Sequence, residues 1–167
     1  MIFCRKGSLL VLLSFVFIVS CKQGEQHEII LDVKAIANKR PAEVEKIVGK
    51  PDSVYTLQMM GKAILCQRYK KYNIEIQYPE SFATDIIVYG PHELPFDQTA
   101  LSSFNLDYRI KHPSDYKKGS YIRWSDFGGF SAITFYNPKK DSLNNITNFN
   151  IFFKAKASGG SNEQQPQ

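Results

Sequence analysis

The sequence predicts an α+β protein made of two tandem units, each a short helix followed by an antiparallel β-meander. Three observations support this prediction. Residues 41–49 have helical periodicity and a clear stop, segments with period-two alternation follow from Ser53, and a weaker copy of this order begins after residue 95. We expect the first unit at residues 31–90 and the second at residues 91–156.

The first unit opens with a short amphipathic helix. Residues 32–38 can form one or two helical turns, and Pro41 then stands where proline favours the first turn of a helix. The apolar residues that share one helix face are Val44, Ile47 and Val48. Gly49 is suited to the C-terminal cap, and Pro51 blocks any extension.

A meander of alternating segments follows this helix. The expected strands are residues 53–58, 63–69, 72–78 and 83–89. Met59-Met60-Gly61-Lys62 and Lys70-Lys71 mark two of the turns. Such short turns leave room only for antiparallel pairing of neighbouring strands. Residues 90–95 contain Gly90 and two prolines, and we expect them to form the linker to the second unit.

The second unit repeats this order less clearly. Asp97 is a favourable N-cap for a short helix. The apolar residues on one face of that helix are Ala100, Leu101 and Phe104. A polar, lysine-rich stretch at residues 111–119 follows, and residues 137–144 are expected to form an irregular loop. The expected strands are residues 121–126, 130–136 and 145–154.

The two units can be matched by pattern. The corresponding segments are Gln67-Arg68-Tyr69 with Arg123-Trp124, Ile74–Tyr78 with Ala132–Tyr136, and Asp85–Tyr89 with Phe149–Phe153. A small sheet with one layer of helix keeps an uncovered face and two open edges, which a second copy can cover. Residues 157–167 are rich in Ser, Gly and Gln, and we expect them to be disordered.

The N-terminal residues have the pattern of a secretory signal peptide. After a positively charged start, an apolar run extends from Leu9 to Val19, and Ser20 precedes Cys21. The run is shorter than the ~20 apolar residues of a membrane-spanning helix. Ile18–Cys21 resembles a bacterial lipobox, which implies that residues 1–20 are removed and that Cys21 is acylated, for example with palmitate.

A lipidated Cys21 would tie the mature protein to a membrane through a tether at residues 21–30. We therefore expect a cell-envelope protein, anchored in the outer membrane of a Gram-negative bacterium. Two alternatives are a retained signal-anchor helix and an ordinary signal peptide that is cut before a free thiol.

Charge and cysteine content limit the classes of partner. The formal charge of the whole chain is +5, and the basic residues are scattered in short, turn-like groups such as Lys117-Lys118. A nucleic-acid-binding protein would present a basic stripe, so we expect no nucleic-acid partner. Beyond the signal region and Cys21, the only remaining cysteine is Cys66, which excludes an intramolecular disulfide and predicts a buried thiol in a strand.

The residues needed for catalysis do not form a recognisable pattern. His27 lies in the tether, and His92 and His112 stand beside prolines in expected loops. No Gly-x-Ser-x-Gly motif and no spaced set of metal-binding side chains is present in the sequence. Gly128-Gly129 joins two strands, where a hairpin turn explains both glycines. We therefore expect no enzyme activity, no metal and no cofactor.

The second unit is rich in aromatic residues, and strict alternation places some of them on each face of its sheet. One face either packs on the first unit or binds a partner. We expect Tyr121, Arg123 and Trp124 to bind the partner, since aromatic and arginine side chains are the usual anchors of protein interfaces.

Val44–Asp52, a short helix that ends in Gly-Lys-Pro-Asp before a meander, resembles a signature of small bacterial lipoproteins. The resemblance is to the superfamily of the small lipoprotein of the outer-membrane β-barrel assembly machinery and the β-lactamase inhibitor protein, the latter with two tandem helix-plus-sheet repeats. It implies a non-catalytic module that binds proteins or supports envelope assembly. This chain lacks the paired cysteines of the inhibitor, so the inhibitory role is not implied.

The alternative function is that of a carrier of a small lipid or glycan, which would bind in a cleft between the repeats.

Two short segments resemble an O-glycosylation site of exported bacterial proteins, Asp-Ser/Thr-apolar. They are Asp52-Ser53-Val54 and Asp141-Ser142-Leu143, and the second falls in an expected loop. The alternative is that each is an ordinary turn.

Overall fold

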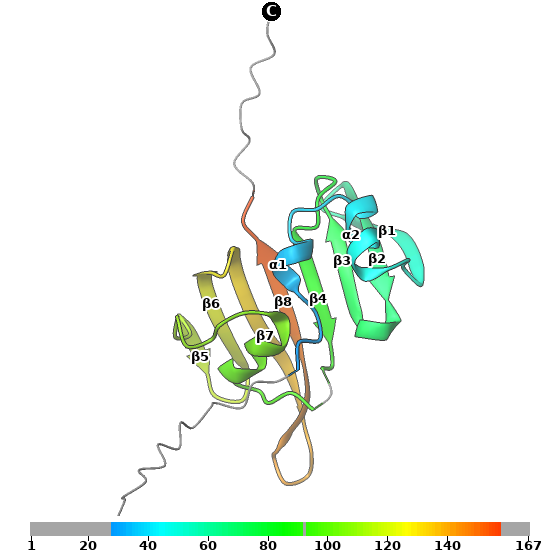
Figure 1. Cartoon of the computed structure of the whole chain (residues 1–167). Coiled ribbons are helices and arrows are strands. Elements are labelled where there is room, and N and C mark those ends of the chain that lie inside the picture. The colour runs from blue at the N-terminus through cyan, green and yellow to red at the C-terminus, as the bar shows by residue number, and fades with distance from the viewer. Residues whose placement is uncertain (1–27, 92, 158–167) are drawn as a thin grey trace, which may run out of the picture.

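The computed structural model describes residues 28–91 and 93–157 (Figure 1). The expected signal peptide at residues 1–20, the acylated Cys21 and most of the expected tether and tail lie outside these residues. The described residues form one antiparallel sheet with short helices on one of its faces, so the α+β class is confirmed.

The sheet has eight strands in two sequential meanders. Their bounds are β1 Ser53–Met59, β2 Lys62–Tyr69, β3 Ile74–Tyr78, β4 Asp85–Tyr89, β5 Asp115–Lys117, β6 Tyr121–Phe127, β7 Phe130–Lys140 and β8 Ile146–Ala155. In space they follow the order β1-β2-β3-β4-β8-β7-β6-β5, with every neighbouring pair antiparallel. The two meanders therefore join through their last strands, and their first strands form the two edges of the sheet.

The helices begin and end where the sequence indicates. In α1 (Val33–Ile36), the Asp32 carboxylate caps the helix by accepting from the backbone N–H groups of Lys34 and Ala35, at 3.0 and 3.1 Å. In α2 (Pro41–Val48), Pro41 occupies the first turn, and the chain leaves the helix at Gly49 with φ of +99°. Both elements confirm the sequence prediction.

Two further helical segments are of the 3₁₀ type: η1 (Lys70–Tyr72) and η2 (Gln98–Phe104). The expected helix after Asp97 is therefore present, but in the tighter form. The Asp97 carboxylate accepts from the backbone N–H of Thr99 at 2.7 Å. Leu101 and Phe104 of η2 are buried against the sheet, as the apolar spacing predicted.

The core lies between the helices and one face of the sheet. It includes Ile74, Ile76 and Tyr78 of β3 and aromatic residues from the second half. Its largest fully buried side chains are Trp124, Phe104, Phe130, Phe135, Phe153, Ile36, Ile74, Ile76, Ile86, Leu101, Ile133 and Ile151. These residues come from both meanders and from the helices, so one continuous cluster fills the space behind all the central strands.

The structure differs from the sequence prediction in two segments. β5 lies inside the polar stretch at residues 111–119, where no strand was expected. β7 continues to Lys140, through residues that were expected to form an irregular loop. In both places a neighbouring strand supplies the pairing that the local residues do not predict.

The expected match of Asp85–Tyr89 with Phe149–Phe153 is off by one residue. Asp85 lies on the sheet face away from the helices, whereas Phe149 is 2% exposed and belongs to the core. The next residue of β8, Asn150, pairs with Tyr89 and does lie on the same face as Asp85, so it is the better match for Asp85. A slip of one residue exchanges the two faces of a strand, because side chains alternate with a period of two. The match of Ile74–Tyr78 with Ala132–Tyr136 has the same error, since Ile74 pairs on the core side and Ala132 pairs with Lys154 on the opposite face.

Candidate binding face

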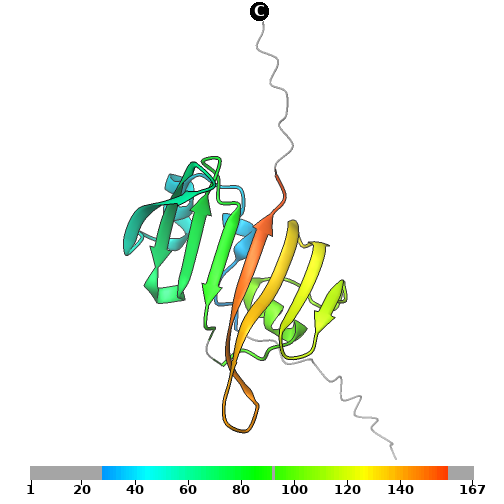
Figure 2. The same ribbon diagram turned by 180° about the vertical axis from the view of Figure 1, so that it is seen from behind.

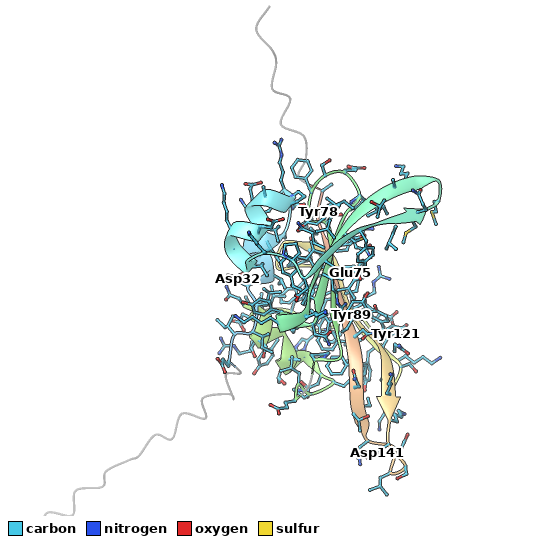
Figure 3. The ribbon with its side chains drawn as sticks, turned by 90° about the vertical axis from the view of Figure 1, so that its right-hand side faces the viewer. Asp32, Glu75, Tyr78, Tyr89, Tyr121 and Asp141 are labelled. Carbon is cyan, nitrogen blue, oxygen red and sulfur yellow. The ribbon has the colours of Figure 1, made fainter. Side chains whose placement is uncertain are left out.

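One face of the sheet carries no helix among the described residues, and we call it the open face. Seen from behind, all the strands lie in front of the helices (Figure 2). In the edge-on view the helices lie on one side of the sheet and Tyr121 on the other (Figure 3). Among the described residues, the open face therefore spans all eight strands without a covering helix.

A row of cross-strand neighbours runs across the open face through all eight strands. From β5 to β1 its members are Asp115, Arg123, Thr134, Phe152, Ile87, Glu75, Arg68 and Ser53. The two apolar members, Ile87 and Phe152, are half-buried and meet where the two meanders join. The row is polar towards both edges, so the open face has an apolar centre with a polar surround.

The second half of the open face presents Tyr121 and Arg123 at its surface. Arg123 is exposed and Tyr121 is half-buried. The Tyr121 hydroxyl donates to the Asp115 carboxylate at 2.6 Å, and this hydrogen bond raises the pKa of Tyr121. Tyr136 and Phe152 supply further half-buried aromatic surface on the neighbouring strands. This combination of aromatic and arginine side chains is typical of protein interfaces.

Trp124 does not belong to this face. It is 0% exposed and packs on the Phe135 ring, with 5.2 Å between the ring centroids, in the core beneath the helices. We therefore do not assign Trp124 to the partner contact that the sequence suggested, because a fully buried side chain cannot touch a partner. Of the three residues expected to bind a partner, the structure brings only Tyr121 and Arg123 to the open face.

The first half of the open face contains a polar network that the sequence did not indicate. Glu75 is only 6% exposed although it lies on the side of β3 away from the core. Its carboxylate accepts from the Tyr55 hydroxyl at 2.5 Å, from the Tyr89 hydroxyl at 3.2 Å and from the Gln77 amide at 2.7 Å. Three donors therefore replace the water that burial removes from this carboxylate.

Arg68 adds a stacked cation to the same network. Its guanidinium lies 4.2 Å from the centroid of the Tyr89 ring and donates to the Asn73 side-chain oxygen at 2.7 Å. Burial, reinforced by the nearby Glu75 carboxylate, raises the pKa of Tyr89 to about 12. The tyrosine hydroxyls thus stay protonated and keep donating at physiological pH. Because its polar groups satisfy one another, this half of the face is held in one arrangement.

Asp85 and Lys154 lie opposite each other on β4 and β8, close to the centre of the open face. The ammonium and carboxylate are 3.9 Å apart, and the Asp85 Oδ1 atom is buried with no hydrogen-bond partner among the described residues. Burial raises the pKa of the Asp85 carboxyl, and the charge of Lys154 opposes this effect. Asp85 is therefore an incompletely satisfied group at the junction of the two halves.

A separate hollow of about 460 Å³ lies on the helix side of the second half. Its lining residues are Phe96, Asp97, Gln98, Thr99, Pro113, Tyr116 and Ile122. This volume is within the range of small-ligand sites. One polar group of this hollow, the Asp97 carboxylate, already accepts two hydrogen bonds from Thr99, one from the backbone N–H and one from the hydroxyl.

Other candidate chemistry is limited in the part of the chain that the structure describes. In it, no group of three His, Cys, Asp or Glu side chains is arranged to hold a metal ion. Cys66 is 0% exposed, as predicted, and burial raises the pKa of its thiol.

No helix among the described residues between 28 and 157 combines the length and the apolar character needed to cross a membrane.

The two Asp-Ser segments lie at the surface. Ser53 opens β1, and Ser142 is in the exposed turn between β7 and β8, at the tip labelled by Asp141 in Figure 3. The Asp141 carboxylate accepts from the backbone N–H groups of Leu143 and Asn145, both at 2.9 Å, and these hydrogen bonds lower its pKa. Asp141 therefore has a clear role as a turn former.

Comparison of the chain with protein-family models, with curated proteins and with solved structures found no match.

Proposed function

We propose that the protein is a non-catalytic binding module of the cell envelope that captures a protein partner on its open face. The observation that supports this function is the one-sided covering of the sheet, which leaves aromatic, aliphatic and arginine side chains partly exposed. An apolar surface with a polar rim on a folded domain is typical of an interaction site. In this proposal Cys21 anchors the module to the outer membrane through the tether at residues 21–30.

The dimensions of the open face favour a protein over a small molecule. Eight strands at a spacing of about 4.8 Å extend over roughly 34 Å. With strands about 20 Å long, the area is roughly 700 Å², close to the 800 Å² or so that each partner contributes to a standard protein interface. The apolar pair of Ile87 and Phe152 would lie near the centre of the contact, with Tyr121 and Arg123 beside it.

The proposal includes a tandem repeat of helix-plus-meander units. The β4–β8 register supports it, because Asp85 pairs with Lys154, Ile87 with Phe152 and Tyr89 with Asn150, which is symmetric about the central pair. Extending this symmetry outward makes Arg68 equivalent to Arg123 and Glu75 equivalent to Thr134. The repeat would explain why the two meanders meet through their last strands.

The two equivalent arginines differ in what surrounds them. Arg68 is occupied by the Tyr89 ring and by Asn73. Arg123 is exposed, and its guanidinium has no hydrogen bond or ion pair within the described residues. Thr134 stands where the first half has Glu75, so the second half lacks the carboxylate network. We therefore assign partner recognition to the second half, with Arg123 and Tyr121 as its first contacts.

Site-specific photo-cross-linking in intact cells tests this function. A photoreactive residue at position 134, beside Arg123 on the open face, should give one discrete cross-linked product, identified by mass spectrometry as an envelope protein. The same residue at exposed position Lys46, on the helix side, is the matched control and should not give that product. The Arg123→Ala substitution should reduce the yield of the cross-link from position 134. Equal labelling from both faces, or none from the open face, would contradict the proposal.

A carrier of a small lipid or glycan is the second candidate, and the hollow beside η2 favours it. The β4–β8 pairing occupies the junction where a cleft between the repeats was expected. Ligand binding to the hollow should raise the melting temperature when envelope lipids or glycans are added. The rise should disappear on filling the hollow with Thr99→Trp, which leaves the open face unchanged.

A further inference from the structure

The edge strand β1 lacks the features that normally protect the edge of a sheet. Residues 53–59 contain no charged residue and no proline, and they are nearly all exposed. Val54, Tyr55 and Met59 are 55%, 36% and 47% exposed. Natural edge strands are usually short, charged, bulged or covered, because unpaired main-chain groups attract another strand. β1 is long for an edge, apolar and rich in residues that favour strands.

The opposite edge of the same sheet is protected. β5 has only three residues, and two of them, Asp115 and Lys117, are charged. Under the symmetry of the β4–β8 junction, β1 and β5 occupy equivalent positions. Among residues 28–91 and 93–157, the fold therefore protects one of two equivalent edges and leaves the other available for another strand.

The β1–β2 turn determines which main-chain groups of β1 are available. Met60-Gly61 is a two-residue turn with φ of +50° and +76°, so Met59 and Lys62 flank it as a hydrogen-bonded pair. Hydrogen-bonded and non-hydrogen-bonded pairs alternate along an antiparallel ladder. Val54, Thr56 and Gln58 therefore turn their N–H and C=O groups away from β2, towards the outside of the sheet.

We infer that β1 pairs antiparallel with β1 of a second copy of this chain, across a two-fold axis at Thr56. In this register Thr56 meets Thr56 of the second copy, and Val54 meets its Gln58. The three outward-facing residues of each copy would form about six main-chain hydrogen bonds.

The chemistry of β1 favours a second copy as the occupant. A neutral strand meets a neutral strand, so no like charges face each other in the two-fold arrangement. Tyr55 would lie beside Leu57 of the second copy, which covers apolar surface on the open-face side. The assembly closes at two copies because the charged edge β5 cannot repeat the contact. The open faces of the two copies would then form one continuous surface.

Disulfide cross-linking of the full chain tests the register. Thr56→Cys should give a covalent dimer under mild oxidation, since directly opposed residues lie about 5.5 Å apart between Cα atoms, within disulfide range. Gln58→Cys should not form a dimer with itself, because the two thiols would be about 13 Å apart along the strand. Mixing the Gln58→Cys and Val54→Cys chains should restore the cross-link. The unsubstituted chain controls for its own cysteines.

A charge substitution tests the pairing itself. The double substitution Val54→Lys and Thr56→Lys places lysines opposite each other and should raise the dimer dissociation constant at least about tenfold. Both positions are exposed, so the melting temperature of the separated subunit should not change. Tyr116→Lys, on the protected edge, is the matched control and should stay dimeric. A wild-type chain that is monomeric at every concentration, or a dimer that survives the double substitution, would overturn the inference. A monomer that accepts an added peptide on β1 would also overturn it.

Discussion

Arg123 and Trp124 are adjacent in the sequence and lie on opposite faces of β6. Alternation along a strand separates them: Arg123 is exposed on the open face, and Trp124 is 0% exposed in the core. The sequence could place them on different faces, but it could not say which face the helices cover. That assignment depends on where α1, α2 and η2 pack, which is a property of the tertiary structure.

Substitution of these two residues should therefore have very different effects on stability. Trp124→Ala removes a fully buried aromatic side chain from the contact with Phe135 and should lower the free energy of unfolding by about 3–5 kcal/mol. Arg123→Ala should change it by less than about 0.5 kcal/mol, because the side chain is exposed. Urea denaturation of the two variants measures both values. A strongly destabilised Arg123→Ala variant would mean that Arg123 has a structural role.

The environment of Asp85 leads to a second prediction, which concerns the pH dependence of stability. Its carboxyl pKa is raised in the folded state, so the ionised form is penalised on folding, and stability falls as the pH rises through that raised pKa. Asp85→Asn removes the ionisable group and keeps its shape. The variant should gain about 2–4 °C in melting temperature at pH 7 relative to the wild type, and less at acidic pH, below the raised pKa, where Asp85 is protonated. An equal gain at pH 7 and at acidic pH would show that the ionisation of Asp85 is not the cause.

The need for glycine at two hairpin turns has a local cause at Gly61 and an added tertiary cause at Gly128. Gly61 and Gly128 both have positive φ, +76° and +61°, at hairpin turns that the sequence predicted. A Cβ on Gly61 would meet nothing within 4 Å, whereas a Cβ on Gly128 would lie 2.5 Å from the Leu106 Cδ2 atom. Leu106 is 3% exposed, so it has little room to move.

Gly128→Ala should consequently destabilise the protein more than Gly61→Ala. The Gly61 variant carries only backbone strain, about 1 kcal/mol, whereas the Gly128 variant adds displacement of a buried leucine and should cost about 2–3 kcal/mol. Thermal unfolding of both variants makes the comparison, and the shared strain at positive φ makes Gly61 a suitable control. Equal losses would show that Leu106 adjusts freely.

Elements with strong local signals were predictable, and those that depend on a neighbour were not. The helix at residues 41–48 follows from Pro41, its apolar spacing and Gly49, and β3 follows from its alternation. β5 was missed because Asp115–Lys117 has no strand pattern of its own and is held by pairing with β6. The burial of Glu75 was missed for the same reason, since the tyrosines that donate to it come from β1 and β4.

At the scale of the whole molecule, the two halves are joined by more than adjacent strands. β4 pairs with β8 along its whole length, and the core behind them draws on both meanders. The backbone N–H groups of Ile30 and Leu31, before α1, donate to the Ser103 carbonyl in η2, at 2.8 and 3.2 Å. The Asp32 carboxylate also accepts from the Asn105 amide at 2.6 Å. Neither half can therefore unfold without exposing the core of the other.

This connection predicts a single cooperative unfolding transition. The chain provides one probe in each half: the fluorescence of its single tryptophan, Trp124, and the accessibility of the buried Cys66 thiol to a labelling reagent, read by peptide mass spectrometry. Both signals should change at the same denaturant concentration, because loss of the β4–β8 pairing exposes apolar surface on both sides. Labelling of Cys66 well before the change in Trp124 fluorescence would show that the halves unfold independently. The symmetric strand order would then describe two domains that share an edge.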